Sequence, residues 1–179
     1  MRLVILDRDG VINQDSSHYI KSPTEWHALP GSLDAIAQLN QAHVKVAVAT
    51  NQSGIARGLF DTATLDAMHA RMQAELSAVG GHIDHLVYCP HGPDEGCACR
   101  KPAPGLYHQI AAHFDCSLCG VPVVGDSGRD LAAAERVGAS PVRVLTGKGQ
   151  LTAREPAWAN IPAFADLQHA IPYLLEQMT

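Results

Sequence analysis

The stretch LVILDRDGVINQD, residues 3–15, joins an apolar run to a pair of acids. Its first four residues are apolar and predict a short buried strand. Asp7 and Asp9 follow at the carboxyl end of that strand, with Arg8 between them. Ligands of open α/β sheets bind at this end, and two neighbouring carboxylates repel each other unless a cation or a proton is shared. The stretch therefore predicts either a ligand site or, more simply, a surface turn with capping acids.

Apolar runs and helical patterns alternate along the rest of the chain, which predicts a parallel sheet with helices on both faces. Right-handed crossovers then bring the carboxyl ends of all the strands to one edge of the sheet. We expect an α/β fold with a doubly wound parallel sheet, forming one domain over residues 1–179. Further strands are predicted at 44–49, 83–88, 121–124 and 141–145, and helices at 32–43, 65–79, from 104, around 131–137, and from about 164, where Pro172 interrupts or restarts the last helix.

The composition is that of a soluble globular protein. Of the 179 residues, 46% are hydrophobic and 17% are charged, and the net charge is −5 with no block of Lys or Arg. This charge and the few aromatic residues disfavour nucleic acid and anionic membranes as main partners. The first apolar run is too short for a signal peptide or a membrane span. We therefore expect a cytoplasmic protein, a monomer with a small-molecule substrate.

Polar residues follow the predicted strands and should meet at one edge of the sheet. Thr50 and Asp126 each come directly after a strand, and Lys101 lies in the loop after the third. Together with Asp7 and Asp9, Asp126 offers the oxygen ligands that suit a hard divalent ion such as Mg²⁺. The Lys101 ammonium and the Thr50 hydroxyl suit phosphate oxygens. This set predicts a site that stabilises a transferring phosphoryl group by position and charge.

In this order the motifs resemble those of the haloacid dehalogenase superfamily of phosphotransferases, over nearly the whole chain. The motifs are DRDG at 7–10, TN at 50–51, Lys101, and GDS at 125–127 followed by Asp130. The resemblance implies a Rossmann-like core in which Asp7 attacks phosphorus and Asp9 exchanges protons with the leaving group and with water. It further implies Mg²⁺ ligation by Asp7, the Asp9 backbone carbonyl and Asp126, and phosphoryl contacts from Thr50, Asn51 and Lys101.

Three features each admit two interpretations. Arg8 either helps to hold the two carboxylates or is exposed to solvent. Asp130 either orders the loop by contacting the site residues or caps the helix that follows it. Cys116 and Cys119 form a C-x-x-C pair that is either redox-active or inert, and the inert reading is favoured because no thioredoxin-like context surrounds it.

A loop rich in Cys and His precedes Lys101. Three thiolates and one imidazole suit a closed tetrahedral Zn²⁺ site, and the alternative is a set of free cysteines beside an incidental histidine. A closed site leaves no ligand position for water, so we expect a structural zinc that fixes Arg100 and Lys101. The four ligands come in two spaced pairs, Cys89 with His91 and Cys97 with Cys99.

The gaps between the motifs leave no room for an inserted cap domain, so the site should be open and loops should select the substrate. The capless body, TNQSG at 50–54 and the Cys/His loop are similar to a group of phosphatases that act on heptose bisphosphates or histidinol phosphate. The heptose reading implies a sugar bisphosphate substrate in bacterial lipopolysaccharide precursor synthesis. Arg100 would bind the second, non-reacting phosphate. Other expected substrate contacts are Asp15, Ser16, Ser17, His18, Asn51, Gln52 and Ser53.

Three other functions rank behind this magnesium-dependent phosphatase. The first is a histidinol-phosphate phosphatase. The second is a signalling receiver domain, which combines acids, a Thr and a Lys on a similar sheet but carries its phosphorylated Asp after the third strand, where this chain has Cys89. The third is a zinc-dependent interaction module.

Overall fold

A single six-stranded sheet organises the computed structural model, which describes residues 1–178. The strand order is β3-β2-β1-β4-β5-β6, and every pairing is parallel. This is the order of a doubly wound Rossmann-like sheet, so the predicted fold class is confirmed. The strands are β1 (Leu3–Leu6), β2 (Lys45–Asn51), β3 (His85–Cys89), β4 (Pro122–Gly125), β5 (Ser140–Val144) and β6 (Ala163–Phe164).

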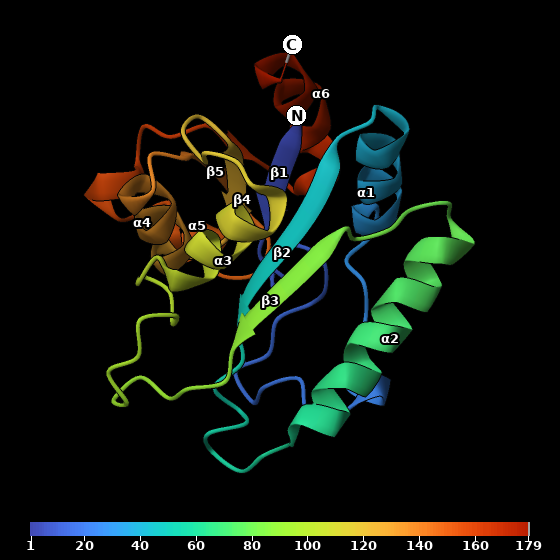
Figure 1. The fold of residues 1–179 in the computed structure, drawn as a ribbon, viewed down its shortest axis with the longest axis vertical. Coiled ribbons are helices and arrows are strands. Elements are labelled where there is room, and N and C mark those ends of the chain that lie inside the picture. Colours follow the sequence, from blue (N-terminus) through green and yellow to red (C-terminus); the bar gives the residue numbers. More distant parts are fainter. Residues whose placement is uncertain (179) are drawn as a thin grey trace.

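Helices cover both faces of the sheet, as Figure 1 shows for α1 and α2 on one side and α3 and α4 on the other. None of the helices within residues 1–178 combines the length and the apolar character needed to cross a membrane. The helices are α1 (Ser32–Gln41), α2 (Thr62–Ala78), α3 (Gly105–Phe114), α4 (Gly128–Arg136), α5 (Gly149–Thr152) and α6 (Leu167–Gln177), with 3₁₀ turns η1 (Pro23–Glu25) and η2 (Pro156–Trp158).

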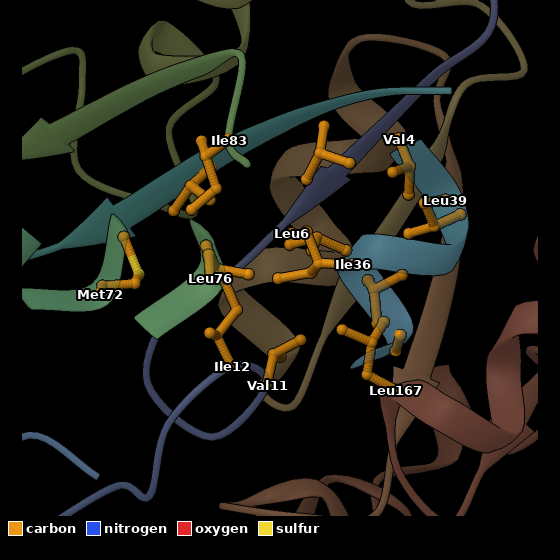
Figure 2. Packing of buried hydrophobic residues seen from close by; sticks show 14 of the residues in the cluster. Val4, Leu6, Val11, Ile12, Ile36, Leu39, Met72, Leu76, Ile83 and Leu167 are labelled. Atoms are coloured by element: carbon orange, nitrogen blue, oxygen red, sulfur yellow. The ribbon is translucent and has the colours of Figure 1, made fainter. Parts of the chain in front are cut away.

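Alternating side chains of β1 supply two separate cores. Val4 and Leu6 pack with residues of α1, α2 and α6, whereas Leu3 and Ile5 pack with residues of α3 and α4. Figure 2 shows the first of these cores, with Leu6 beside Ile36 of α1. Successive side chains of a strand point to opposite faces, and each buried aliphatic side chain contributes about 1.5–3 kcal/mol. The central strand is thus fixed from both sides, and so is the loop that leaves its carboxyl end.

Element boundaries differ from the sequence-based expectation in two places that matter. β2 runs to Asn51, so Thr50 lies inside the strand instead of after it. The last helix begins at Leu167, not near 164, because Phe164 belongs to β6, and two residues of strand carry no periodic signal. Asp166 caps this helix by accepting a 2.9 Å hydrogen bond from the His169 backbone N–H, and Pro172 lies within it.

The segment between Asp9 and α1 is anchored in the core. Trp26 is fully buried and Ile20 is 8% exposed, and both belong to the core on the α1 side. Leu29 N–H donates to the Ile12 carbonyl at 2.9 Å and closes the loop onto the end of β1. The segment contains one 3₁₀ turn and no other helix, so it covers the sheet edge as a loop.

Replacing Leu39 of α1 by alanine should lower the free energy of unfolding by about 2–5 kcal/mol, because Leu39 is fully buried in this core. Leu151→Ala is the matched control, since Leu151 is 64% exposed, and it should change stability by less than about 0.5 kcal/mol. Urea unfolding of both variants measures the difference. Equal losses would contradict the assignment of the core.

Candidate active site

Two acids lie at the point where the strand order of the sheet reverses. Asp7 follows β1 and Asp126 follows β4, and these strands are neighbours at the centre of the sheet. The Asp7 backbone N–H donates to the Val124 carbonyl at 2.9 Å, which fixes the two strand ends against each other. In doubly wound folds this switch point is where ligands bind, outside the carboxyl ends of the strands.

The Lys101 ammonium lies between the acids of the site. Its Nζ is 3.0 Å from Asp7 Oδ1, 2.6 Å from Asp130 Oδ1 and 2.7 Å from the Ala49 carbonyl oxygen, and the residue is 2% exposed. Burial by itself would lower the pKa of Lys101, but the charges of Asp130 and then Asp7 raise it above its ordinary value. Lys101 therefore stays charged although it is buried.

The Asn51 side chain positions the backbone of Lys101. Asn51 Nδ2 donates to the Lys101 carbonyl and the Lys101 N–H donates to Asn51 Oδ1, both at 3.0 Å. This reciprocal pair joins the end of β2 to the loop after β3. The pair uses one of the two Nδ2 protons, so the predicted phosphate contact of Asn51 can come from its backbone N–H or from the second Nδ2 proton.

Asp130 has both of the roles that the sequence left open. Its Oδ2 accepts hydrogen bonds from the Ser127 N–H at 3.0 Å and the Ser127 hydroxyl at 2.7 Å, which caps α4. Its Oδ1 is paired with Lys101. Both carboxylate oxygens are therefore occupied, and Asp130 serves to hold the lysine in place.

Two carboxylate oxygens at the switch point remain available for a cation. Asp7 Oδ1 accepts the Arg8 N–H at 2.8 Å as well as Lys101, and Asp126 Oδ2 accepts the Lys148 N–H at 2.7 Å. Within residues 1–178, Asp7 Oδ2 and Asp126 Oδ1 have no hydrogen-bond partner. Burial and the charge of Asp130 raise the pKa of Asp7, and they raise that of Asp126 to about 7. Unshared oxygens on acids that resist ionisation fit a hard divalent cation such as Mg²⁺.

Two glycines allow the chain to close around Asp126. Gly10 and Gly147 have φ of +83° and +54°, a region that favours glycine. A Cβ on either residue would collide with Asp126 Oδ2. The loops after β1 and β5 therefore both need glycine where they meet this carboxylate.

Asp9 is held by an extensive set of donors. The Arg8 guanidinium reaches Asp9 Oδ1 at 2.9 Å and Oδ2 at 3.1 Å through Nη2, while Asn13 Nδ2 and Gln52 Nε2 donate at 2.8 and 2.9 Å. Burial raises the pKa of Asp9, but Arg8 and the two amides lower it more, so the pKa lies below its ordinary value. Arg8 is fully buried. Of the two interpretations of Arg8, solvent exposure is therefore wrong, and of the two carboxylates its side chain holds only that of Asp9.

Thr50 retains a free hydroxyl proton next to Asp9. Gln52 Nε2 donates to Thr50 Oγ1 at 2.9 Å, so the hydroxyl acts as acceptor there, and its own proton can be donated elsewhere. Thr50 and Gln52 are both buried, at 1% and 5% exposure. The amide thus ties the threonine and the acid into one unit at the end of β2.

One cavity of about 350 Å³ brings most of the predicted site residues together. His18 is the exception, because it is exposed and does not line the cavity. The predicted residues that line it are Asp7, Asp9, Asp15, Ser16, Ser17, Thr50, Asn51, Gln52, Ser53, Arg100, Lys101 and Asp126.

Three further basic side chains line this cavity that no sequence motif indicated, Arg57, Arg129 and Lys148. Lys148 Nζ is 3.3 Å from Asp15 Oδ2, and Arg57 lies over the Tyr19 ring at 5.6 Å. Arg129 has no ion pair with any residue of the described chain. Isolated basic residues in loops and helix starts carry no motif, so only the fold brings them to the cavity.

The four predicted zinc ligands gather at the end of β3. Sulfur atoms of Cys89, Cys97 and Cys99 are 3.2–3.7 Å apart, and His91 Nδ1 is 3.2 Å from Cys99 Sγ. A tetrahedral zinc with Zn–S bonds of about 2.3 Å requires S···S separations of about 3.7 Å, close to these values. All five cysteines are free thiols, so no disulfide competes with this arrangement.

The cluster is joined directly to the cavity. The Arg100 N–H donates to Cys97 Sγ at 3.4 Å, and Arg100 Nη1 donates to the His91 carbonyl at 3.3 Å. Lys101 is the next residue. Cys116 and Cys119 lie in the turn after α3 and line neither this cluster nor the cavity.

Comparisons with known proteins agree with this geometry. The HAD-hydrolase-like family model matches residues 98–170. The D-glycero-beta-D-manno-heptose-1,7-bisphosphate 7-phosphatase of Bordetella bronchiseptica is 61% identical over 152 residues, which cover 85% of each chain. The enzyme of the same name from Pseudomonas putida is 59% identical over 93% of this chain and 95% of its own.

A solved structure extends the likeness to three dimensions. The crystal structure of the D,D-heptose 1,7-bisphosphate phosphatase from B. bronchiseptica, complexed with magnesium and phosphate, superimposes with a TM-score of 0.95 at 55% identity. The match covers 99% of both chains. Among the interpretations of the sequence, these findings favour the phosphatase over the receiver domain and the interaction module. The chain belongs to the D-glycero-beta-D-manno-heptose-1,7-bisphosphate 7-phosphatase family of HAD-like hydrolases.

Proposed function

We propose that this protein is a magnesium-dependent phosphatase that removes the 7-phosphate of D-glycero-β-D-manno-heptose 1,7-bisphosphate. The names of the relatives support this substrate. The observation that carries the proposal is the buried Lys101 ammonium beside Asp7, at the switch point and in the wall of a cavity. We further propose a one-domain monomer of the bacterial cytoplasm, because one chain completes the cavity and the named relatives are bacterial enzymes of heptose metabolism.

In the first step, Asp7 attacks phosphorus, a carboxylate oxygen forms a new P–O bond, and the bond from phosphorus to the sugar oxygen breaks. Asp9 gives its proton to the departing sugar oxygen. In the second step, Asp9 takes a proton from water, which attacks the aspartyl-phosphate and restores Asp7 with release of phosphate. Thr50 and Lys101 donate to the phosphoryl oxygens throughout, where negative charge develops.

Mg²⁺ would be held by the free carboxylate oxygens of Asp7 and Asp126 together with the Asp9 backbone carbonyl. When bound, it supplies positive charge that offsets both the acids and the anionic substrate. This role is consistent with the raised pKa of Asp7 and Asp126, since each acid lies in a place that disfavours its charge until a cation is near.

Asp9 must gain a proton before it can act as an acid. Its depressed pKa keeps it ionised without substrate. The negative charge of an arriving phosphate favours the protonated carboxyl, so the substrate itself raises the pKa of Asp9 as it binds. The same donors that depress this pKa then return Asp9 to its ionised, basic form after the leaving group departs.

Basic residues at the cavity favour a substrate with two phosphates. Arg57, Arg100, Arg129 and Lys148 all line it in addition to Lys101. Lys101 and the bound metal ion would neutralise the reacting phosphate. The remaining basic side chains are then available to a second phosphate at the far end of a sugar. The sequence-predicted contact from Arg100 fits this role, because the zinc cluster holds its backbone.

A phosphate-release assay on the heptose 1,7-bisphosphate tests the proposal. The wild-type protein with Mg²⁺ should release one phosphate per substrate, and the product should be the heptose 1-phosphate. Asp7→Asn should lower turnover by more than about 10³-fold, because it removes the nucleophile. Its melting temperature should stay within a few degrees of wild type.

Histidinol phosphate and simple sugar monophosphates form the comparison arms of the same assay. A higher kcat/KM for histidinol phosphate would overturn the heptose assignment but leave the phosphatase in place. Unchanged turnover in Asp7→Asn would overturn the mechanism itself.

Magnesium affinity should depend on pH through Asp126. Its pKa of about 7 means that the carboxyl is largely protonated at pH 6 and ionised at pH 8, and Mg²⁺ must displace the proton. The apparent Kd of Mg²⁺ should therefore fall about tenfold between pH 6 and pH 8. Calorimetry on the zinc-loaded protein without substrate measures this. Asp126→Asn should abolish magnesium binding. Asp66→Asn, which changes an exposed acid of α2, should not affect it. Tighter magnesium binding at pH 6 than at pH 8 would contradict the assignment.

We also propose that Cys89, His91, Cys97 and Cys99 hold a structural Zn²⁺. Metal analysis should find one zinc per chain, and Cys99→Ser should lose it while Cys119→Ser, the matched thiol outside the cluster, keeps it. Cys99→Ser should lower the melting temperature and raise KM more than it lowers kcat, because the loop presents Arg100 and Lys101 to the substrate. A zinc-free protein with normal melting temperature and KM would contradict a structural role.

A further inference from the structure

The guanidinium of Arg8 has a second partner besides Asp9. Its Nη1 is 3.2 Å from Nε2 of His69, a residue of α2. Its Nε and Nη2 point to Asp9 instead, at 3.2 and 2.9 Å from Oδ1. Arg8 is fully buried, so water does not replace either partner. The arginine thus forms a bridge from helix α2 to the carboxylate beside the phosphoryl site.

The direction of this hydrogen bond fixes the form of the histidine. A guanidinium only donates, so Nε2 of His69 must accept and the imidazole must be neutral with its proton on Nδ1. Burial first, and then the charge of Arg8, lowers the pKa of His69 to about 4, which agrees with a neutral ring. His69 also lines a cavity of about 350 Å³ between α2 and β3, which shares no lining residue with the active-site cavity. Nδ1 has no partner within the described chain and is available to water there.

We propose that His69 is a positioning residue for Asp9 and acts through Arg8. This inference rests on the proposed phosphatase function. Among residues 1–178, His69 is the only hydrogen-bond partner of Arg8 Nη1, because the contacts of Arg8 to Asp9 use Nε and Nη2. Without His69, the buried Nη1 group of Arg8 would lack a hydrogen-bond partner. An unsatisfied donor that is buried costs more free energy than one that is exposed to water. The guanidinium would turn to satisfy it and would no longer hold both Asp9 oxygens.

Kinetics of His69→Ala test this role against a merely structural one. The variant should lower kcat about tenfold, the low end of the cost of removing an outer hydrogen-bond partner at metal sites. KM should change less than twofold, since His69 does not line the substrate cavity. His69→Gln, whose amide oxygen can accept from Arg8, should recover most of kcat. His82→Ala, which removes an exposed histidine beyond α2, should leave kcat unchanged.

A double-mutant cycle identifies the residue through which His69 acts. In an Asp9→Asn background, His69→Ala should cause no further loss of residual turnover, because contacts that act through a shared partner are not additive. An equal loss in both backgrounds would overturn the proposal, as would a lowered melting temperature with unchanged kcat. A wild-type protein without any phosphatase activity would instead overturn the proposed function.

The tautomer offers a readout independent of activity. Long-range ¹⁵N–¹H spectra of the histidine rings should show His69 neutral at pH 7 and protonated on Nδ1, with an unprotonated Nε2. Protonation of Nε2 would show that His69 does not accept from Arg8 and would overturn the proposal even if the enzyme is active.

Discussion

The ion pairs of Lys101 are the interaction on which the site depends. Three acids, Asp7, Asp126 and Asp130, offer oxygens within 4.8 Å of one another near the centre of the sheet, and without a cation their charges would repel. A buried lysine paired with two of them removes part of that repulsion, and the same two acids keep the lysine protonated despite its burial. Loss of one partner from such a group leaves an uncompensated buried charge, which is far more costly than loss of a surface pair. The lysine and the acids therefore stabilise each other. One lysine does not balance the negative charge of three acids, and a divalent cation would offset the remainder.

Several parts of the fold serve to keep this lysine in place. Asn51 binds its backbone from the end of β2, and Asp130 binds its side chain from the first turn of α4. The Cys/His cluster binds the backbone one residue before Lys101, where Cys97 Sγ accepts the Arg100 N–H. A loop with few apolar residues gains its order from such polar links, and a precise cation is more useful to a phosphoryl transfer than a mobile one.

Periodic patterns and ordered motifs in the sequence predicted the sheet and the position of the site. Features that depend on contacts between distant parts of the chain could not be predicted in this way. Alternating strands and helices predicted the doubly wound sheet, and the ordered acids predicted the edge where they meet. β6 was missed because two residues show no period, and Trp26 lies outside every predicted helix and strand, so no periodic pattern indicates its burial. Arg129 reaches the cavity through the start of α4, and the buried Arg8 contacts His69 far along the chain. Each of these is a tertiary contact that leaves no local pattern.

Lys148 contributes two separable elements to the cavity. Its amide holds Asp126, while its ammonium lies beside Asp15 in the loop after β1, which lines the cavity. Every residue except proline has such an amide. Exchange of this side chain would therefore change the charge of the cavity beside Asp15 but keep the hydrogen bond that holds the Asp126 carboxylate, so the two features can diverge independently.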